Sequence, residues 1–262
     1  MIEKYPRLHS LAIRMLQCNR SIYVLKNYFL DTDALFKQIE IETCSICNRN
    51  CEFCPVSLRK RPAEFMKTEL FHKIIQELKE INYQGLISLH HYGEPLLDDR
   101  LEDFIKEIRA ELGNNRIEIN TNGDFISTER YNSLKNAGLS LLRITQYDKT
   151  PKDNLQEFLS HSPKDVILEV KNEDTLGLYN RGGAIKLKHD FYPIACNPMI
   201  IAIRSNGEVN VCCNDFFNKI QFGNINNEKI IDIWNKIEYR NWRKDIKDGV
   251  FTHPVCRKCL GL

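Results

Sequence analysis

The sequence has no long apolar segment and no marked excess of one charge. No uninterrupted apolar run of about 18 residues occurs, so no transmembrane helix is expected. The formal net charge is +2 and neither sign gathers into a block, which argues against a nucleic-acid or membrane-surface ligand. The most apolar N-terminal stretch, 8–30, contains several polar and charged residues and lacks a small-residue cleavage site. We therefore expect no signal peptide and a cytoplasmic location.

Cysteine, by contrast, is abundant, with ten among 262 residues. Disulfides are disfavoured in a reducing cytoplasm, so clustered cysteines there indicate metal ligands or redox groups. The rest of the composition is that of a globular protein, with 42% hydrophobic and 27% charged residues. The length suits one large α/β domain with a small addition. The cysteines are therefore the feature that the function has to explain.

Strand-like and helix-like patterns alternate as far as residue 170. Residues 38–41 alternate apolar and polar side chains, which predicts a strand that runs directly into the first cysteines. Repeated βα units imply a parallel sheet with helices outside it, either barrel-like or doubly wound. Further strands are expected at 86–90, 116–120, 139–145 and 166–170, and helices at 68–82, at 98–112, from Ser127 up to Gly138, and at 155–160.

The pattern changes from about residue 191. Ser205-Asn206-Gly207 between two apolar runs predicts a hairpin, in which Gly207 permits the tight reversal. Residues 228–247 then predict a helix, and the chain closes with Cys256-Arg-Lys-Cys259. We therefore expect three parts: an N-terminal helical extension at 1–37, a core at 38–190 and a small C-terminal α+β module at 191–262.

Residues able to carry chemistry lie where the expected strands end. Cys47, Glu94, Asn120 and Thr145 each occupy such a position. In barrels the reactive groups sit at the carboxyl ends of the strands. We therefore expect the active site at this edge of the sheet.

The first cysteine group is Cys47, Cys51 and Cys54, in a loop after the first expected strand. Three thiolates can hold three irons of a [4Fe–4S] cube and leave the fourth iron open to a non-protein ligand. The spacing also suits a zinc knuckle that recruits Cys44 as its fourth ligand. Spacing alone leaves both possibilities open.

The segment Cys47–Cys54 resembles the CxxxCxxC signature of the radical S-adenosylmethionine (SAM) superfamily, including an aromatic residue, Phe53, before the last cysteine. Gly93-Glu94-Pro95 resembles the GEP segment of that family, with Tyr92 in place of one glycine of the commoner GGEP. The resemblance implies a partial (β/α)6 barrel similar to a TIM barrel. It also implies that SAM binds the open iron and is cleaved to a 5′-deoxyadenosyl radical, which abstracts hydrogen from the substrate.

The same resemblance implies roles for single residues in SAM binding. Gly93, Glu94 and Pro95 would bind the amino group of SAM, and Phe53 would contact the adenine. Contacts to the ribose or carboxylate are implied at Asn120 and Thr145. Cys44 falls outside the signature, and we interpret it as a buried strand residue.

The second cysteine group is Cys196, Cys212, Cys256 and Cys259. Two thiols on the expected hairpin and two on a terminal C-x-x-C motif would close one tetrahedral or cubic site, and spacing alone suits a zinc ribbon equally well. The arrangement resembles the twitch domain, the one-cluster form of the SPASM extension of radical SAM enzymes. The resemblance implies an auxiliary [4Fe–4S] cluster with four protein ligands, and thus a role in electron transfer.

The stretches 87–97, 121–125, 144–146 and 180–183 resemble the radical SAM dehydrogenases of aminoglycoside biosynthesis. That resemblance implies that a secondary alcohol of a sugar or aminocyclitol is oxidised to a ketone, with the auxiliary cluster accepting an electron. Arg181 is then the candidate that contacts the substrate hydroxyl and helps its deprotonation. The candidate residues for lining the substrate site are His91, Tyr92, Asn214 and Asp215.

Other functions remain open on the sequence. A radical SAM epimerase would need a hydrogen-atom donor, for which Cys213 is the candidate, although the pattern favours a small buried residue at this position. A peptide maturase would act on a peptide substrate, and a zinc-binding interaction module would have no catalysis at all. For a radical SAM enzyme we expect a flavodoxin or ferredoxin as the reductant.

Overall fold

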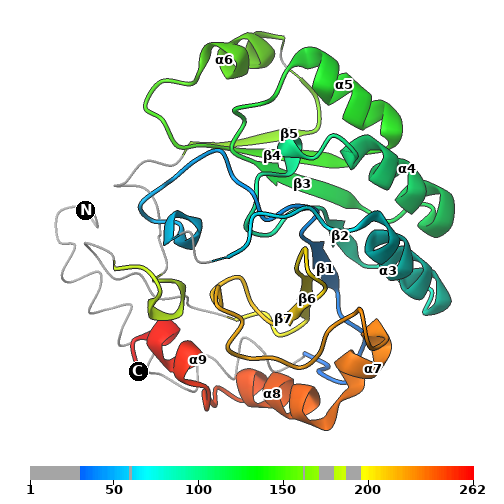
Figure 1. Cartoon of the computed structure of the whole chain (residues 1–262), viewed down its shortest axis with the longest axis vertical. Coiled ribbons are helices and arrows are strands. Elements are labelled where there is room, and N and C mark those ends of the chain that lie inside the picture. The colour runs from blue at the N-terminus through cyan, green and yellow to red at the C-terminus, as the bar shows by residue number, and fades with distance from the viewer. Residues whose placement is uncertain (1–29, 59–60, 162, 171–179, 187–195) are drawn as a thin grey trace.

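The computed structural model of the chain describes residues 30–58, 61–161, 163–170, 180–186 and 196–262. The helix expected within residues 1–37 falls, up to Phe29, outside these ranges. Within them, one sheet of seven strands has the order β5-β4-β3-β2-β1-β6-β7. Figure 1 shows this sheet with helices α3 to α6 along its outer side and the C-terminal helices below it.

Six of the described strands are parallel to one another, and the spacing of apolar residues explains where they form. In β1, Ile39 and Ile41 are fully buried, whereas Gln38 and Glu40 are half-buried, as strand alternation requires. The parallel α/β arrangement predicted from the sequence is confirmed. The strands are β1 Gln38–Ile41, β2 Leu86–Ser88, β3 Ile117–Thr121, β4 Leu141–Gln146, β5 Val166–Val170, β6 Ile200–Ile203 and, antiparallel to β6, β7 Val209–Asn210.

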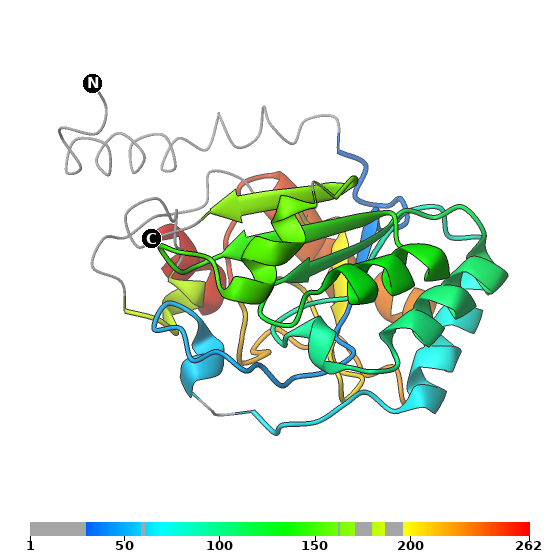
Figure 2. The same ribbon diagram turned by 90° about the horizontal axis from the view of Figure 1, so that it is seen from above.

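The helices between the strands pack their apolar faces on the sheet, and Figure 2 shows them in a layer beside it. The Ser127 side chain accepts a hydrogen bond from the Arg130 amide at 3.1 Å and caps one helix, which ends at Gly138 with a left-handed backbone. The apolar periodicity and these end signals place the helices correctly to within a few residues. They are α3 Thr68–Glu80, α4 Leu101–Leu112, α5 Thr128–Ala137 and α6 Asp153–Ser160.

The predicted hairpin forms, but it belongs to the main sheet. Gly207 has a φ of +84°, and its amide donates to the Arg204 carbonyl at 2.8 Å to close the turn. Strand β6 pairs in parallel with β1. The C-terminal module expected at 191–262 therefore extends the sheet of the core. Its expected boundary at residue 191 lies outside the described residues.

The described part of the chain has three helices after the hairpin: α7 Ile230–Asn235, α8 Ile237–Lys247 and α9 Pro254–Leu260. The sequence predicts one helix over 228–247, but the backbone is extended at Lys236, whose amine donates to the Phe222 carbonyl at 2.8 Å. Of the helices described, none is long and apolar enough to cross a bilayer. The buried apolar residues form one cluster that reaches from the sheet to α8.

Candidate active site between two cysteine groups

The loop that carries the first cysteine group is pressed against the Gly93–Pro95 segment. A Cβ atom on Gly93 would stand 2.0 Å from the Cys44 carbonyl oxygen, so only glycine allows this approach. The Glu94 amide donates to the Ile46 carbonyl at 2.7 Å, and the buried Cys44 thiol donates to the Glu94 carbonyl at 3.2 Å. These backbone contacts hold the two segments of the predicted SAM site together.

The three thiols of the first group, Cys47, Cys51 and Cys54, are half-buried and lie near one another. Burial raises the pKa of Cys47 to about 11, and the charges of Glu94 and of the other two cysteines add to this rise. The Asn122 side-chain amide also lies 3.9 Å from the Cys47 sulfur. Thiolates that oppose one another's ionisation favour a shared cationic centre, because bound metal ions offset their repulsion. The donor set therefore fits an iron–sulfur cluster with three protein ligands.

Glu94 links the ends of two strands through its side chain. Its buried carboxylate accepts hydrogen bonds from the Thr121 hydroxyl at 2.6 Å, the Asn122 amide at 2.8 Å and the Leu96 amide at 3.1 Å. Burial raises the pKa of Glu94, and these hydrogen bonds work in the opposite direction. Because the carboxylate already has protein partners, direct binding of the SAM amino group by this side chain stays a prediction.

An aromatic wall adjoins the cysteine loop. The ring of Phe53 lies 5.2 Å from that of Tyr147, whose hydroxyl is hydrogen-bonded to Thr145. On the next strand, the Asn120 side-chain amide lies 2.9 Å from His90 Nε2. Among the described residues, the buried Asn120 Oδ1 has no hydrogen-bond partner. The predicted ribose or carboxylate contacts Asn120 and Thr145 thus lie near the ends of the adjacent strands β3 and β4. Tyr147, which packs on the predicted adenine contact Phe53, is a residue that sequence reasoning missed.

The second cysteine group also comes together, from the hairpin and α9. Burial raises the pKa of Cys256 and of Cys259 to about 12, and the charge of Cys196 adds to the rise in both. The same neighbour acts on Cys212, whose sulfur accepts a hydrogen bond from the Asn214 amide at 3.3 Å. Among the described residues, no group of three or more histidine, cysteine, aspartate or glutamate side chains is already arranged to hold a metal ion. The fit therefore rests on the donor set, four neighbouring thiols, which suits an iron–sulfur cluster.

Arg181 lies between the two cysteine groups. Its Nη1 is 3.4 Å from the Cys213 carbonyl and 3.2 Å from Asn214 Oδ1. Burial lowers the pKa of Arg181, but the nearby thiolates, which include Cys54 of the first group and Cys212 of the second, raise it overall. Its backbone has a φ of +50°, a conformation that a residue other than glycine rarely adopts. The structure thus brings together three of the candidate residues, Arg181, Cys213 and Asn214, and their roles stay predictions.

Two of the predicted substrate residues have partners inside the protein. His91 Nδ1 lies 2.8 Å from Glu40 Oε2, and the imidazole has no exposed surface. The Tyr92 hydroxyl donates to the Cys213 carbonyl. Direct substrate contacts of His91 and Tyr92 stay predictions, whereas Glu40 emerges as a partly exposed carboxylate near Arg181.

Asp215 is engaged by the backbone that follows it. Its two carboxylate oxygens accept the amides of Lys219 at 3.0 Å and Ile220 at 2.8 Å. This arrangement stabilises the turn after the second cysteine group. A substrate contact of Asp215 would have to compete with these hydrogen bonds.

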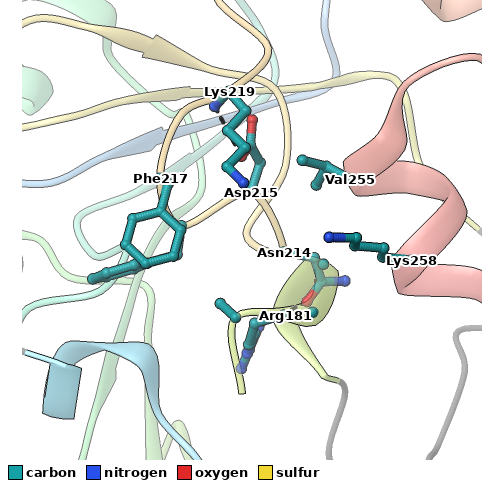
Figure 3. Close-up of a pocket in the computed structure, with 11 residues that line it drawn as sticks. Arg181, Asn214, Asp215, Phe217, Lys219, Val255 and Lys258 are labelled. Carbon is teal, nitrogen blue, oxygen red and sulfur yellow. Dashed lines mark hydrogen bonds between the residues drawn. The ribbon is translucent and has the colours of Figure 1, made fainter. Parts of the chain in front are cut away.

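A small cavity opens beside these residues, with an empty volume of about 300 Å³ that includes its mouth. Figure 3 shows Asn214 and Asp215 on one side, Val255 and Lys258 of α9 on another, and Arg181 below. The short helix Arg181–Gly183 packs against α9, and Gly182 approaches Val255 so closely that a Cβ would stand 2.7 Å from its side chain. The cavity therefore adjoins the second cysteine group.

Two family models match this chain. The model of the radical SAM superfamily matches residues 41–170, and that of the SPASM iron-sulfur cluster-binding domain matches residues 196–260. The S-adenosyl-L-methionine-dependent 2-deoxy-scyllo-inosamine dehydrogenase of Niallia circulans is 34% identical over 240 residues, which cover 87% of this chain and 94% of that protein. The chain belongs to the radical SAM superfamily. It is a SAM-dependent oxidoreductase with an auxiliary iron–sulfur domain.

Solved structures of this superfamily agree in fold. BtrN in complex with AdoMet and 2-DOIA has a TM-score of 0.74 and 32% identity, over 83% of this chain and 89% of that one. BtrN in an open conformation has a TM-score of 0.65 and 27% identity, over 83% and 88%. AnSMEcpe with bound AdoMet shares the fold at a TM-score of 0.52 and 13% identity, over 80% and 83%.

Membership of this superfamily settles the question of metal that spacing leaves open. The first cysteine group, Cys47, Cys51 and Cys54, lies within the region matched by the radical SAM model, and the second lies within the cluster-binding domain, so both stay the predicted cluster ligands. Sequence reasoning missed Glu40 and Tyr147. Glu40 could have been found as an acidic residue at an inward position of β1, between Ile39 and Ile41.

Proposed function

We propose that this chain oxidises a secondary alcohol of an aminocyclitol or related sugar to a ketone. Its similarity to a 2-deoxy-scyllo-inosamine dehydrogenase supports this reaction, since the matched region covers 94% of that enzyme. The cavity beside Arg181, lined also by Asn214 and Lys258, offers polar partners for the hydroxyl groups of such a substrate. A flavodoxin or ferredoxin would supply the reducing electron.

When bound, SAM and the first cluster would supply a radical that removes one hydrogen atom from the carbinol carbon, and the auxiliary cluster would accept one electron. The third product of the oxidation, the hydroxyl proton, would pass to solvent water. Arg181 is too basic to accept it, so its Nη1 would donate a hydrogen bond to the substrate oxygen and stabilise the negative charge that develops there.

Glu40 would give the same site a preference for amine-bearing substrates. Burial alone would raise its pKa, but the hydrogen bond with His91 and the charges around it lower the value overall, so the carboxylate is ionised at neutral pH. An ionised carboxylate near Arg181 can pair with a substrate ammonium group. Asn214, held 3.2 Å from Arg181, would orient the guanidinium.

One observation carries this proposal: Arg181 places its guanidinium 3.4 Å from the Cys213 carbonyl, next to Cys212 of the second cysteine group, and has a strained backbone there. Strained conformations persist where function requires a side chain at one place. A substrate that contacts Arg181 would lie beside Cys213 and Asn214, next to the second cysteine group.

The test is anaerobic reconstitution with 2-deoxy-scyllo-inosamine that carries deuterium on the carbinol carbon. We expect a product lacking two hydrogen atoms, formed in equal amount with deuterated 5′-deoxyadenosine. Arg181→Lys should lower kcat about tenfold or more, since a hydrogen bond to a charged group contributes about 1.5–3 kcal/mol. Arg240→Lys, at an exposed ion pair with Asp33, is the matched control. Formation of deoxyadenosine without oxidised product from any aminocyclitol or sugar alcohol would refute the proposal.

A second candidate is a radical epimerase, which the position of Cys213 supports. This residue is exposed, and its carbonyl lies 3.4 Å from Arg181 Nη1, so its thiol could return a hydrogen atom to a substrate radical held at Arg181. An epimerase would leave the substrate mass unchanged in ordinary water and introduce deuterium from heavy water. Mass spectrometry of the product in the two solvents separates the two candidates.

A further inference from the structure

Arg49 lies in the middle of the first cysteine loop, two residues after Cys47 and two before Cys51, and it binds two carboxylates at once. Its Nε and Nη2 donate to the two oxygens of Asp124 at 2.7 and 2.5 Å. Its Nη1 and Nη2 donate to the two oxygens of Asp148 at 3.2 and 2.6 Å. Both pairs are bidentate, the arrangement that the planar guanidinium favours and an ammonium group cannot reproduce.

The two carboxylates come from the ends of neighbouring strands. Asp124 lies three residues beyond β3, and Asp148 lies two residues beyond β4. The Asp124 side chain is 4% exposed, and it also accepts hydrogen bonds from the Asn48 amide at 2.6 Å and the Lys152 amine at 2.9 Å. Arg49 therefore fastens the cysteine loop to two strand ends, with one of the carboxylates almost completely buried.

The network continues from this pair into the rest of the predicted SAM site. Asn122 Nδ2 donates to Asn48 Oδ1 at 2.9 Å, and Asn122 Oδ1 accepts the Asp124 amide at 2.9 Å. The Asn122 amide in turn donates to Glu94. A continuous chain of hydrogen bonds thus joins the cysteine loop to the Gly93–Pro95 segment.

We call the two bidentate pairs of Arg49 its Asp124 arm and its Asp148 arm. The Asp148 arm connects Arg49 to the aromatic pair of Phe53 and Tyr147. The Arg49 guanidinium carbon lies 5.8 Å from the centre of the Tyr147 ring, and Tyr147 directly precedes Asp148 in the chain. Tyr147 in turn packs on Phe53 at 5.2 Å. By binding Asp148, Arg49 therefore also fixes the position of the Tyr147 ring, on which Phe53 packs.

We propose that Arg49 is a positioning residue for SAM cleavage: the Asp124 arm fixes the cysteine loop around its cluster, and the Asp148 arm fixes the Tyr147–Phe53 wall against the cofactor. The two arms have separable effects. This inference rests only on membership of the superfamily, and its test needs no substrate. It can therefore fail while the proposed alcohol oxidation stands, and the proposed oxidation can fail while this inference stands.

The experiment compares reconstituted holoenzymes of Arg49→Lys, Asp124→Asn and Asp148→Asn with the wild type. Arg49→Lys keeps the charge but loses both bidentate pairs, so we expect a chelator to remove iron about tenfold faster, the equivalent of about 1.4 kcal/mol. Asp124→Asn should behave alike. Asp148→Asn should keep its iron at the wild-type rate and weaken SAM binding several-fold, with an altered electron paramagnetic resonance (EPR) spectrum of the reduced cluster with SAM.

Arg116→Lys is the matched control, because it alters an exposed arginine whose ion pair with Glu118 lies at the opposite end of β3. It should leave iron retention, SAM affinity and the spectrum unchanged. Arg49→Lys that matches the wild type in all three would overturn the proposal, since charge alone would then suffice. A lowered thermal stability of the variants with unchanged SAM affinity and spectrum would overturn it as well, because Arg49 would then be merely structural.

Discussion

Gly93→Ala tests whether close backbone contact between the cysteine loop and the Gly93–Pro95 segment builds the SAM site. The new methyl group would stand 2.0 Å from the Cys44 carbonyl oxygen, 2.8 Å from its carbon and 3.0 Å from the Ile46 carbonyl oxygen. All three are backbone atoms, so no side-chain rotation relieves the overlap. The two segments have to move apart until the 2.0 Å contact reaches an ordinary 3.4 Å or more.

That movement breaks the 2.7 Å hydrogen bond from the Glu94 amide to the Ile46 carbonyl. A buried amide left without a partner costs about 1–3 kcal/mol, and overpacking costs about another 1–3 kcal/mol. The free energy of unfolding should therefore fall by roughly 2–6 kcal/mol. Because the displaced atoms belong to the predicted SAM site, SAM affinity should fall together with stability.

The assay combines urea unfolding of the apoprotein with SAM binding to the reconstituted enzyme under anaerobic conditions. Gly113→Ala is the control: this glycine has a φ of +70° and open space around the position of a Cβ. Backbone strain should cost Gly113→Ala about 1–3 kcal/mol without changing SAM affinity. Wild-type SAM affinity and iron content in Gly93→Ala would refute the reasoning.

Three further predictions concern single residues near the two cluster sites: Glu42, Tyr92 and Cys213. Glu42→Gln should lower the free energy of unfolding by about 3–5 kcal/mol at neutral pH, since it leaves Arg61 without its buried partner. Burial alone would raise the pKa of Glu42, but hydrogen bonds from Arg61 lower it overall. The wild type therefore loses this stabilisation as the pH falls below 4.5. In urea titrations, the difference in free energy of unfolding between Glu42→Gln and the wild type should shrink over that pH range. Tyr92→Phe removes the hydroxyl that donates to the Cys213 carbonyl and should cost about 1 kcal/mol in thermal unfolding, with both clusters retained by iron analysis. Cys213→Ser should preserve ketone formation in the mass-spectrometric assay, whereas an epimerase would lose turnover.

The local patterns in this sequence determine much of the fold and the cluster ligands. Strand β5 begins and ends at the residues that its apolar run predicts, and Ser127 and Gly138 bound α5 as their chemistry requires. The cysteine spacings and the Gly93–Pro95 segment are equally local. Such features depend on neighbours within a few residues, which the sequence displays directly.

Features that depend on distant partners could not be predicted in this way. Arg49 and Asp124 are 75 residues apart, and nothing in either segment indicates the other. The break at Lys236 depends on the carbonyl of Phe222, and α9 is too short to show a helical period. The pairing of β6 with β1 joins segments that are more than 150 residues apart along the chain.

That pairing bears on how the two clusters act together. Strand β1 leads to the first cysteine loop, and the β6–β7 hairpin, hydrogen-bonded to β1 through β6, leads to Cys212. Tyr92, adjacent to the Gly93–Pro95 segment, makes a second connection between the two cluster sites, because its hydroxyl donates to the Cys213 carbonyl. Changing the separation of the two cluster sites would therefore require breaking sheet hydrogen bonds and a buried side-chain contact. A spacing fixed in this way suits a reaction in which one small substrate gives its hydrogen atom on one side and its electron on the other.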